Sequence, residues 1–194
     1  AASLGRDEYA IWPDEPAQLA MARFLGGGTR WNMHNHSVWR PGYALLLSPV
    51  HRITDDPVTV FHAGLALNAV LGGVAAALMV LTARRLTPMR PAACAATAVV
   101  VACAPSMLFT TSFVWSESLV SPVFLATLLA LLRLQRSPSF ANALVAGGCA
   151  AAAFATHSRL LPLTAITAAV IVHSARSRIG NTRTAIAVVA TAVG

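Results

Sequence analysis

The chain has 194 residues, of which 56% are hydrophobic and 11% are charged, whereas an ordinary soluble domain has about 25% charged residues. With a mean hydropathy of +0.64, this composition excludes a small soluble enzyme, a disordered tail and a disulfide-framed secreted domain. The net charge of +7 comes from 14 basic residues, all of them arginine, and 7 acids. Because the arginines are dispersed between apolar runs, they indicate a membrane protein and no nucleic-acid binding.

Residues 1–57 form a polar segment that differs from the rest of the chain. They contain six of the seven acids and three of the four tryptophans. Within this segment, residues 17–25 are predicted to form a short helix that ends at Gly26, because glycine commonly follows the last helical residue. Asp14 or Glu15 is then expected to be the N-cap of this helix, since carboxylates accept hydrogen bonds from the free N–H groups of a first turn.

Apolar runs rich in Ala, Val and Leu follow and are predicted to be transmembrane helices. About 20 helical residues cross the ~30 Å hydrocarbon layer of a bilayer, so the shorter runs could instead be re-entrant, although full spans are favoured. The expected spans are 58–81, 92–109, 119–132, 141–155 and 160–172, and a sixth begins at Ala185. We therefore expect an all-α polytopic membrane protein, with residues 58–194 holding five spans and the start of a sixth, truncated at both ends.

The arginines also predict the orientation of the spans. Arginine-rich connections, at residues 84–90, 133–136 and 176–183, alternate with connections that have almost no basic residue. Arginine-rich loops lie on the cytoplasmic side, so residues 1–57 are expected to be extracytoplasmic. All seven acids then fall on that outer face, at positions Asp7, Glu8, Asp14, Glu15, Asp55, Asp56 and Glu117.

Three groups of acids are candidates for chemistry. The pairs Asp7–Glu8 and Asp14–Glu15 stand beside Trp12 at the expected membrane surface. Partly desolvated carboxylates can act as bases toward a hydroxyl or as metal ligands, while helix capping is the structural alternative. Glu117 stands at the outer mouth of the third span, where an ionisable group indicates a site unless it caps the helix.

Residues 31–43 are rich in aromatic and hydrogen-bonding groups. His34 and His36 are two positions apart with no third ligand fixed by spacing, so a structural or substrate contact is favoured over a metal site. Trp39 and Tyr43 are candidates for substrate contacts or for anchors at the membrane interface. Arg40 could pair with a phosphate of a substrate or of a lipid headgroup.

The remaining polar groups lie among the apolar runs. Arg159 is the one basic residue of its outer connection, and a lipid phosphate or Glu117 would explain it as an anionic partner. His62 and Asn68 in the first span are expected to make packing or interhelical polar contacts. The three cysteines, Cys94, Cys103 and Cys149, are expected to be small buried side chains with no disulfide or zinc framework.

Several of these segments resemble the GT-C glycosyltransferases, which include protein mannosyltransferases and lipid A aminoarabinose transferases. The resemblance rests on Pro13-Asp14-Glu15, on the helix Ala-x-x-Ala-Met-Ala-Arg-Phe-Leu with Gly26 to Gly28 after it, and on Trp39-Arg40-Pro41-Gly42-Tyr43 leading into a span. The helix start at Ser116-Glu117-Ser118 and the turn from Thr156 to Arg159 look like later outer connections of that family. Similarity extends over nearly the whole chain through short motifs, and it implies a GT-C-like transmembrane helix bundle whose extracytoplasmic first loop carries short helices.

The resemblance implies an enzyme of the cell envelope that moves a sugar from a polyprenyl-phosphate donor to an acceptor hydroxyl outside the membrane. The acceptor would be a glycan, a lipid or a protein. In this family an acid of the first loop acts as general base or positions the acceptor, and this role carries over to Asp14, with Asp7 as the competing candidate. The family's second acid corresponds to Glu117, although better-known members have Asp at that position. Glu15 is a further candidate catalytic acid, and Glu8 is a candidate substrate contact. Some members use a divalent metal ion as a cofactor. The resemblance is compatible with such a metal ion in this chain and does not require one.

Two other functions compete with glycosyl transfer. A transporter or flippase for a lipid-linked or small substrate is the first alternative. Transport by ionic coupling requires acids in the bilayer interior, and none of the seven acids lies there, which favours the enzyme. A non-catalytic scaffold with a degenerate site is the second alternative, and no residue excludes it.

Overall fold

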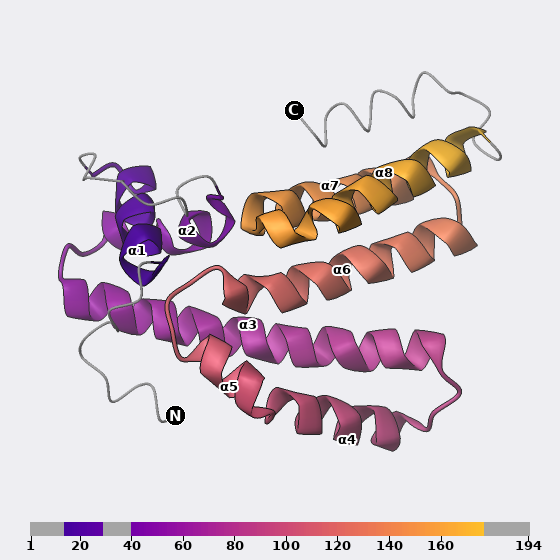
Figure 1. The fold of residues 1–194 in the computed structure, drawn as a ribbon, viewed down its shortest axis with the longest axis horizontal. Coiled ribbons are helices and arrows are strands. Elements are labelled where there is room, and N and C mark those ends of the chain that lie inside the picture. Colours follow the sequence, from indigo (N-terminus) through magenta and orange to yellow (C-terminus); the bar gives the residue numbers. More distant parts are fainter. Residues whose placement is uncertain (1–13, 29–39, 177–194) are drawn as a thin grey trace. The chain divides into compact units, whose positions relative to one another are not determined.

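The computed structural model describes residues 14–28 and 40–176, and within these ranges the chain forms helices and no strand (Figure 1). The all-helical class expected from the sequence is therefore confirmed for these residues. The predicted sixth span lies outside them. The helices are α1 (Asp14–Leu25), α2 (Gly42–Leu47), η3 (Val50–Arg52), α3 (Pro57–Leu86), α4 (Pro91–Ala102), α5 (Pro105–Thr111), α6 (Glu117–Arg136), α7 (Phe140–Thr156), η4 (Ser158–Leu160) and α8 (Leu161–Ser174).

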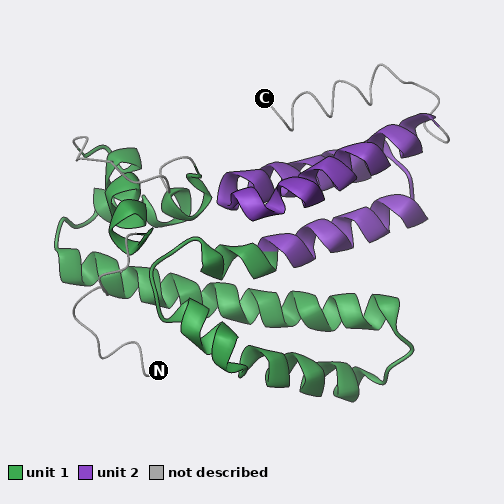
Figure 2. Cartoon of the chain, viewed as in Figure 1, with its two compact units in different colours: residues 1–122 green, residues 123–194 purple. Residues whose placement is uncertain are grey.

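The chain divides into two compact units, residues 1–122 and residues 123–194 (Figure 2). Unit 1 contains α1 to α5 and the first residues of α6. Unit 2 contains the rest of α6 together with α7, η4 and α8. Each unit is described by itself.

Two of the described helices, α3 and α6, are long and apolar enough to cross a membrane. Helix α3 has 30 residues, which at 1.5 Å per residue corresponds to about 45 Å and exceeds the ~30 Å hydrocarbon layer. Its first residue is Pro57, which suits this position because the first N–H of a helix has no partner within the helix and proline has none. The Asp56 side chain caps the helix by accepting from the Thr59 N–H at 2.9 Å. Arg84 and Arg85 occupy its last turn, where cations favour the helix dipole.

The second apolar run is not the single helix expected over residues 92–109. It breaks between α4 and α5, and the two helices are bent by 61°. Pro105 is the physical reason, because proline has no N–H to donate and it forces the preceding Ala104 into an extended conformation with ψ of 139°. Cys103 is exposed at this bend, contrary to the expectation that all three cysteines are buried.

Unit 2 has a small core of alanines and larger aliphatic side chains. Ala143 and Ala146 of α7 pack with Leu131, Leu134 and Ile171. The Thr164 hydroxyl of α8 also donates to the Ala150 carbonyl of α7 at 3.2 Å. Helices α7 and α8 confirm that the last two complete runs are helical, and that they cross a membrane stays a prediction.

Candidate functional site at the N-terminal end of helix α3

Helix α1 ends in a glycine turn that presses it against the segment after α2. The Gly28 N–H donates to the Arg23 carbonyl at 2.9 Å and the Gly27 N–H to the Phe24 carbonyl at 3.1 Å. This is the Schellman pattern, and it requires the φ of +104° that Gly27 adopts. A Cβ on Gly26 would lie 2.8 Å from the Cβ of His51. Close packing of α1 on this segment therefore depends on the absence of a side chain at position 26.

Glu15 joins α1 to a distant part of unit 1. Its side chain is 0% exposed, and its Oε1 accepts a hydrogen bond from the backbone N–H of Val114 at 2.8 Å. Val114 is also 0% exposed, so its N–H has lost access to water and needs such a partner. The contact ties the first turn of α1 to the connection between α5 and α6, which lies 99 positions away in the sequence.

Tyr43 and Asn68 form a second buried connection, between α2 and α3. The Tyr43 hydroxyl donates to the Asn68 Oδ1 at 2.8 Å and lies 3.2 Å from the Gly64 carbonyl. The Asn68 Nδ2 donates in turn to the carbonyls of Phe113 at 2.6 Å and Thr111 at 3.2 Å. Burial, together with the nearby Glu15 carboxylate, raises the pKa of Tyr43 well above its ordinary value. The Tyr43 hydroxyl therefore remains protonated and can donate.

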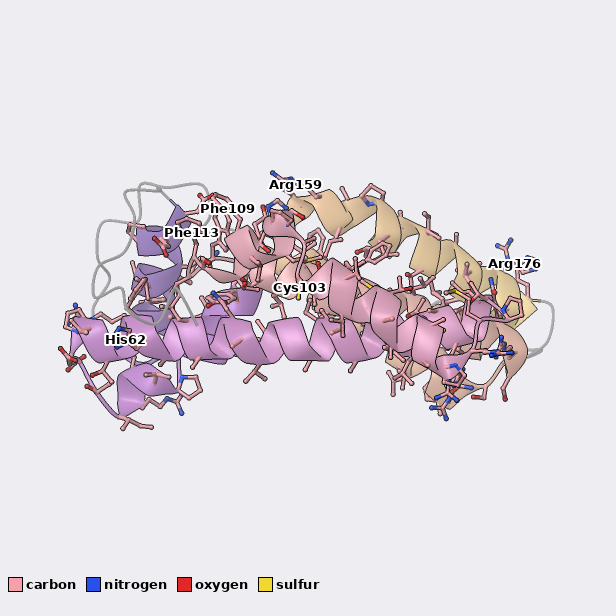
Figure 3. All side chains as sticks on the ribbon, turned by 90° about the horizontal axis from the view of Figure 1, so that it is seen from below. His62, Cys103, Phe109, Phe113, Arg159 and Arg176 are labelled. Carbon is pink, nitrogen blue, oxygen red and sulfur yellow. The ribbon has the colours of Figure 1, made fainter. Side chains whose placement is uncertain are left out.

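The connection between α5 and α6 is itself held by aromatic packing and by hydrogen bonds to one carbonyl. Phe109 and Phe113 are neighbours (Figure 3), with ring centroids 4.8 Å apart. The ring of Trp115 packs on Phe113 with a centroid distance of 5.2 Å. The indole of Trp115 and the hydroxyl of Ser118 both donate to the Thr110 carbonyl. A Cβ on Gly64 would lie 2.8 Å from both methyl groups of Val114. Only glycine therefore lets α3 approach this connection so closely.

Asp14 is exposed although the adjacent Glu15 is buried. Successive residues of a helix point about 100° apart, so burying one neighbour leaves the other on the solvent side of α1. The helix begins at Asp14, three residues before the expected start, which places Glu15 inside the first turn. The expectation that Glu15 could be the N-cap is therefore wrong. Its carboxylate is used in tertiary packing instead.

The other described candidates lie in different parts of the chain. Tyr43 is 0% exposed, and its hydroxyl is engaged inside unit 1. Arg40 is half-buried just before α2, and Glu117 is half-buried as the first residue of α6. Arg159 is exposed in η4 of unit 2, where its backbone N–H donates to the Nδ1 of His157 at 3.1 Å.

Five predicted site residues, Asp7, Glu8, His34, His36 and Trp39, lie outside the described residues. Among residues 14–28 and 40–176, no three His, Cys, Asp or Glu side chains gather into a group that could hold a metal ion. The described carboxylates and histidines alone thus do not fit a metal centre, and a metal at this site stays a prediction.

His51 was missed by the sequence analysis. Both of its ring nitrogens are buried with no hydrogen-bond partner among the described residues. The same holds for the Oε1 of Gln18, whose side chain on α1 is 2% exposed. Burial lowers the pKa of His51, and the nearby Arg23 lowers it further, while Asp55 acts in the opposite direction. A polar residue in a short turn such as η3 carries no sequence signal of this kind, because its burial results from the packing of α1.

We expect the lowered pKa of His51 to make unit 1 less stable in mild acid. The unfolded chain then binds a proton more readily than the folded chain, so stability is full above the ordinary histidine pKa of about 6.5 and falls as the pH decreases below it. The His51→Gln variant cannot titrate. The midpoint of thermal unfolding should therefore decrease less between pH 7.5 and 5.5 in His51→Gln than in the natural chain.

A matched control is His173→Gln, which removes an exposed histidine of unit 2. This control retains His51, so it should keep the part of the pH dependence that comes from His51. Equal decreases in the natural chain and in His51→Gln would show that His51 does not link unfolding to pH.

Asn68 confirms the expectation of an interhelical polar contact in the first span, since it joins α3 to α2 and to the connection after α5.

The comparisons with known proteins add no relative, because no protein-family model, no curated protein and no solved structure matches this chain. The candidate site is therefore defined by its own geometry, which is an exposed carboxylate on α1 next to Glu15, the residue that is bonded to the connection between α5 and α6.

Proposed function

We propose that this protein is a GT-C-type glycosyltransferase that moves a sugar from a polyprenyl-phosphate donor to an acceptor hydroxyl on the extracytoplasmic side of the membrane. The observation that carries the proposal is the pair Asp14 and Glu15. Glu15 is buried and bonded to Val114, whereas Asp14 is exposed on the same turn of α1. An exposed carboxylate is thereby held in a fixed position beside a helix of membrane-spanning length.

Such a carboxylate can serve as a general base. The acceptor oxygen attacks the anomeric carbon of the donor, the bond between that carbon and the phosphate oxygen breaks, and polyprenyl phosphate leaves with the bonding electrons. Asp14 takes the proton of the acceptor hydroxyl as the new glycosidic bond forms. Asp7 competes for this role, and Glu117 is the candidate for the second acid of the site.

The leaving phosphate gains negative charge, and cations near it would lower the barrier. Arg40, just before α2, is the candidate for this task, and Arg159 stays a prediction as a substrate contact. A guanidinium group suits this task because it can donate two parallel hydrogen bonds to a phosphate. The residues His34, His36 and Trp39 stay predictions as substrate contacts, whereas Tyr43 is 0% exposed and connects α2 to α3.

The orientation of α3 supports an extracytoplasmic site. Arg84 and Arg85 lie in the last turn of α3, at the opposite end from Gly64 and Asn68, which bind the α2 segment. Because arginine-rich ends remain on the cytoplasmic side, the end of α3 beside α1 and α2 would face the other compartment. In this arrangement the polyprenyl chain lies within the bilayer and the sugar lies at the level of Asp14.

The proposal is tested with the full-length protein in liposomes that contain a polyprenyl-phosphate sugar labelled in the sugar. Addition of cell-envelope glycan, lipid or protein fractions as acceptors should give labelled acceptor and release polyprenyl phosphate in equal amounts. Movement of the intact lipid-linked sugar between leaflets would instead identify a transporter. Binding of the donor without transfer to any fraction would identify a scaffold. Either result would contradict the proposal.

A further inference from the structure

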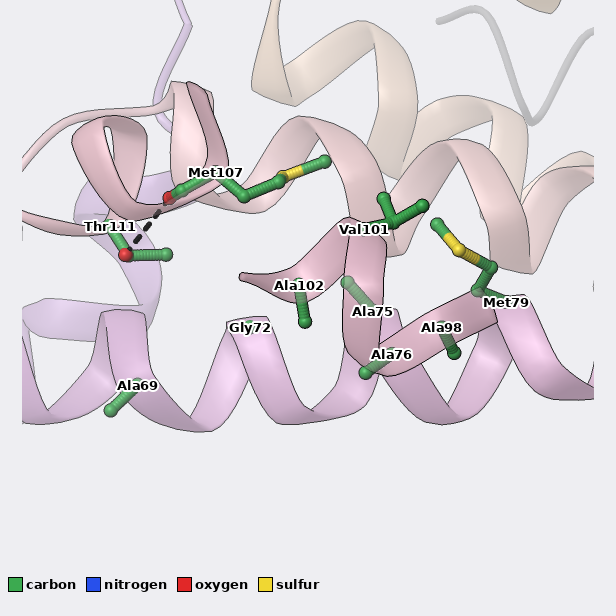
Figure 4. A pocket seen from close by; sticks show the side chains of 10 residues that line it. All are labelled: Ala69, Gly72, Ala75, Ala76, Met79, Ala98, Val101, Ala102, Met107 and Thr111. Carbon is green, nitrogen blue, oxygen red and sulfur yellow. Dashed lines mark hydrogen bonds between the residues drawn. The ribbon is translucent and has the colours of Figure 1, made fainter. Parts of the chain in front are cut away.

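Unit 1 contains a cavity of about 160 Å³ between α3 and the bent pair α4 and α5 (Figure 4). The residues on both sides of it are too small to fill it, since they include Gly72, Ala75 and Ala76 of α3 and Ala98 and Ala102 of α4. The bend at Pro105 turns α5 away from the line of α4. The sequence therefore places small side chains on both faces at the point where a helix breaks.

The wall of the cavity is mainly apolar. Thr111 is the one polar side chain among its lining residues, and its hydroxyl already donates to the Met107 and Leu108 carbonyls at 3.0 and 3.2 Å. A buried water needs two to four polar partners, and the lining side chains supply no free donor. A phosphate or sugar headgroup would find no donor either. The wall of the cavity is therefore suited to a hydrocarbon chain.

The surroundings of the cavity identify the source of that hydrocarbon. The cavity is partly open to the outside, and the outward side chains nearby are exposed and apolar, among them Val70 and Val74 of α3 and Val99 and Val100 of α4. The lining residues of α3 run from Ala69 to Met79. Ala69 lies about 18 Å along the helix axis from Pro57, which places the cavity at mid-bilayer depth, where acyl chains are the surrounding medium.

We propose that this cavity holds a segment of one acyl chain of a bilayer phospholipid, which fills the space between α3 and the broken helix. The volume is close to that of an engineered apolar cavity of about 150 Å³ that binds benzene, so a few methylene groups fit it. The inference rests on the membrane embedding of α3 and is independent of the proposed glycosyl transfer. The headgroup of the phospholipid makes no contact with the cavity.

Two glycines of α3 provide a matched test. A Cβ on Gly72 lies 3.6 Å from the Thr111 methyl group inside the cavity, whereas a Cβ on Gly73 meets nothing within 4 Å. The protein is placed in bilayers that contain phosphatidylcholine with a photoreactive diazirine at the middle of one acyl chain. After illumination, the labelled peptides are identified by mass spectrometry.

We expect the natural chain and Gly73→Leu to be labelled preferentially in residues 69–79 and 98–111. Gly72→Leu should reduce that labelling several-fold, because its side chain occupies the cavity. Ala102→Leu fills the cavity from α4 and provides a second variant if Gly72→Leu fails to fold. Equal labelling of Gly72→Leu and Gly73→Leu would overturn the proposal. Labelling of the natural chain that does not favour residues 69–79 and 98–111 would overturn it as well. Loss of labelling when polyprenyl phosphate is added at a low mole fraction would also overturn it, because the occupant would then be a prenyl chain.

Discussion

Asp14→Asn is expected to lower the rate of sugar transfer by about 10²–10⁴-fold, which is the usual contribution of a general base. Asparagine has nearly the same size as aspartate and can still accept a hydrogen bond, but it cannot take the proton of the acceptor hydroxyl. Because Asp14 is exposed, the change leaves the buried contacts of α1 intact. The measurement is the initial rate of labelled acceptor formation by the full-length protein at saturating donor.

The control for this experiment is Asp55→Asn, which removes a different exposed carboxylate from the segment before α3. Its transfer rate should stay within a few-fold of that of the natural chain. If Asp14→Asn also retains its rate, Asp14 has no part in the proton transfer. The competing assignment to Asp7 would then be tested in the same way.

Glu15→Ala is expected to destabilise unit 1 strongly. The substitution leaves the Val114 N–H buried without its acceptor, because Val114 is 0% exposed and donates to Glu15. An unsatisfied buried polar group costs about 1–3 kcal/mol, and the space vacated by the side chain adds a further loss of packing. The unfolding temperature of the purified chain should decrease by several degrees or more. Unfolding is followed by the reactivity of the Cys94 thiol, which is buried in the folded chain.

Glu15→Gln separates the hydrogen bond from the charge. Glutamine retains an acceptor oxygen and the shape of the side chain, so its unfolding temperature should lie much closer to that of the natural chain. An unfolding temperature for Glu15→Ala equal to that of the natural chain would show that the contact with Val114 does not hold α1 in place. In that case the fixed position of Asp14 would lose its physical basis.

The different environments of Asp14 and Glu15 follow from tertiary packing. In the sequence the two residues form one acidic pair, and either could cap a helix or act as a base. The tertiary structure buries Gln18, Met21 and Ala22 together with Glu15, which defines the inner face of α1. Local patterns predict the helix, but the face that is buried depends on what packs against it, namely α2, the segment after α2 and the Val114 connection.

The second apolar run shows a related difference. Its uniform composition predicts one helix over residues 92–109, although Pro105 lies within it. A proline inside a helix can be tolerated, as Pro122 is within α6, so the residue alone does not determine whether a helix breaks. The chain bends between α4 and α5. The residues of α3 that face this bend are small, so a cavity remains between them.

The sequence by itself determined the helical class, the approximate positions of the apolar runs and the concentration of six of the seven acids before the first of these runs. These properties are local, because hydrophobicity, capping residues and charge act over neighbouring positions in the chain. Only the tertiary structure decided that Glu15 is bonded to Val114, that Tyr43 is joined to Asn68, and that Asp14 remains exposed. Those outcomes depend on buried N–H and carbonyl groups finding partners across distant segments, which no local pattern encodes.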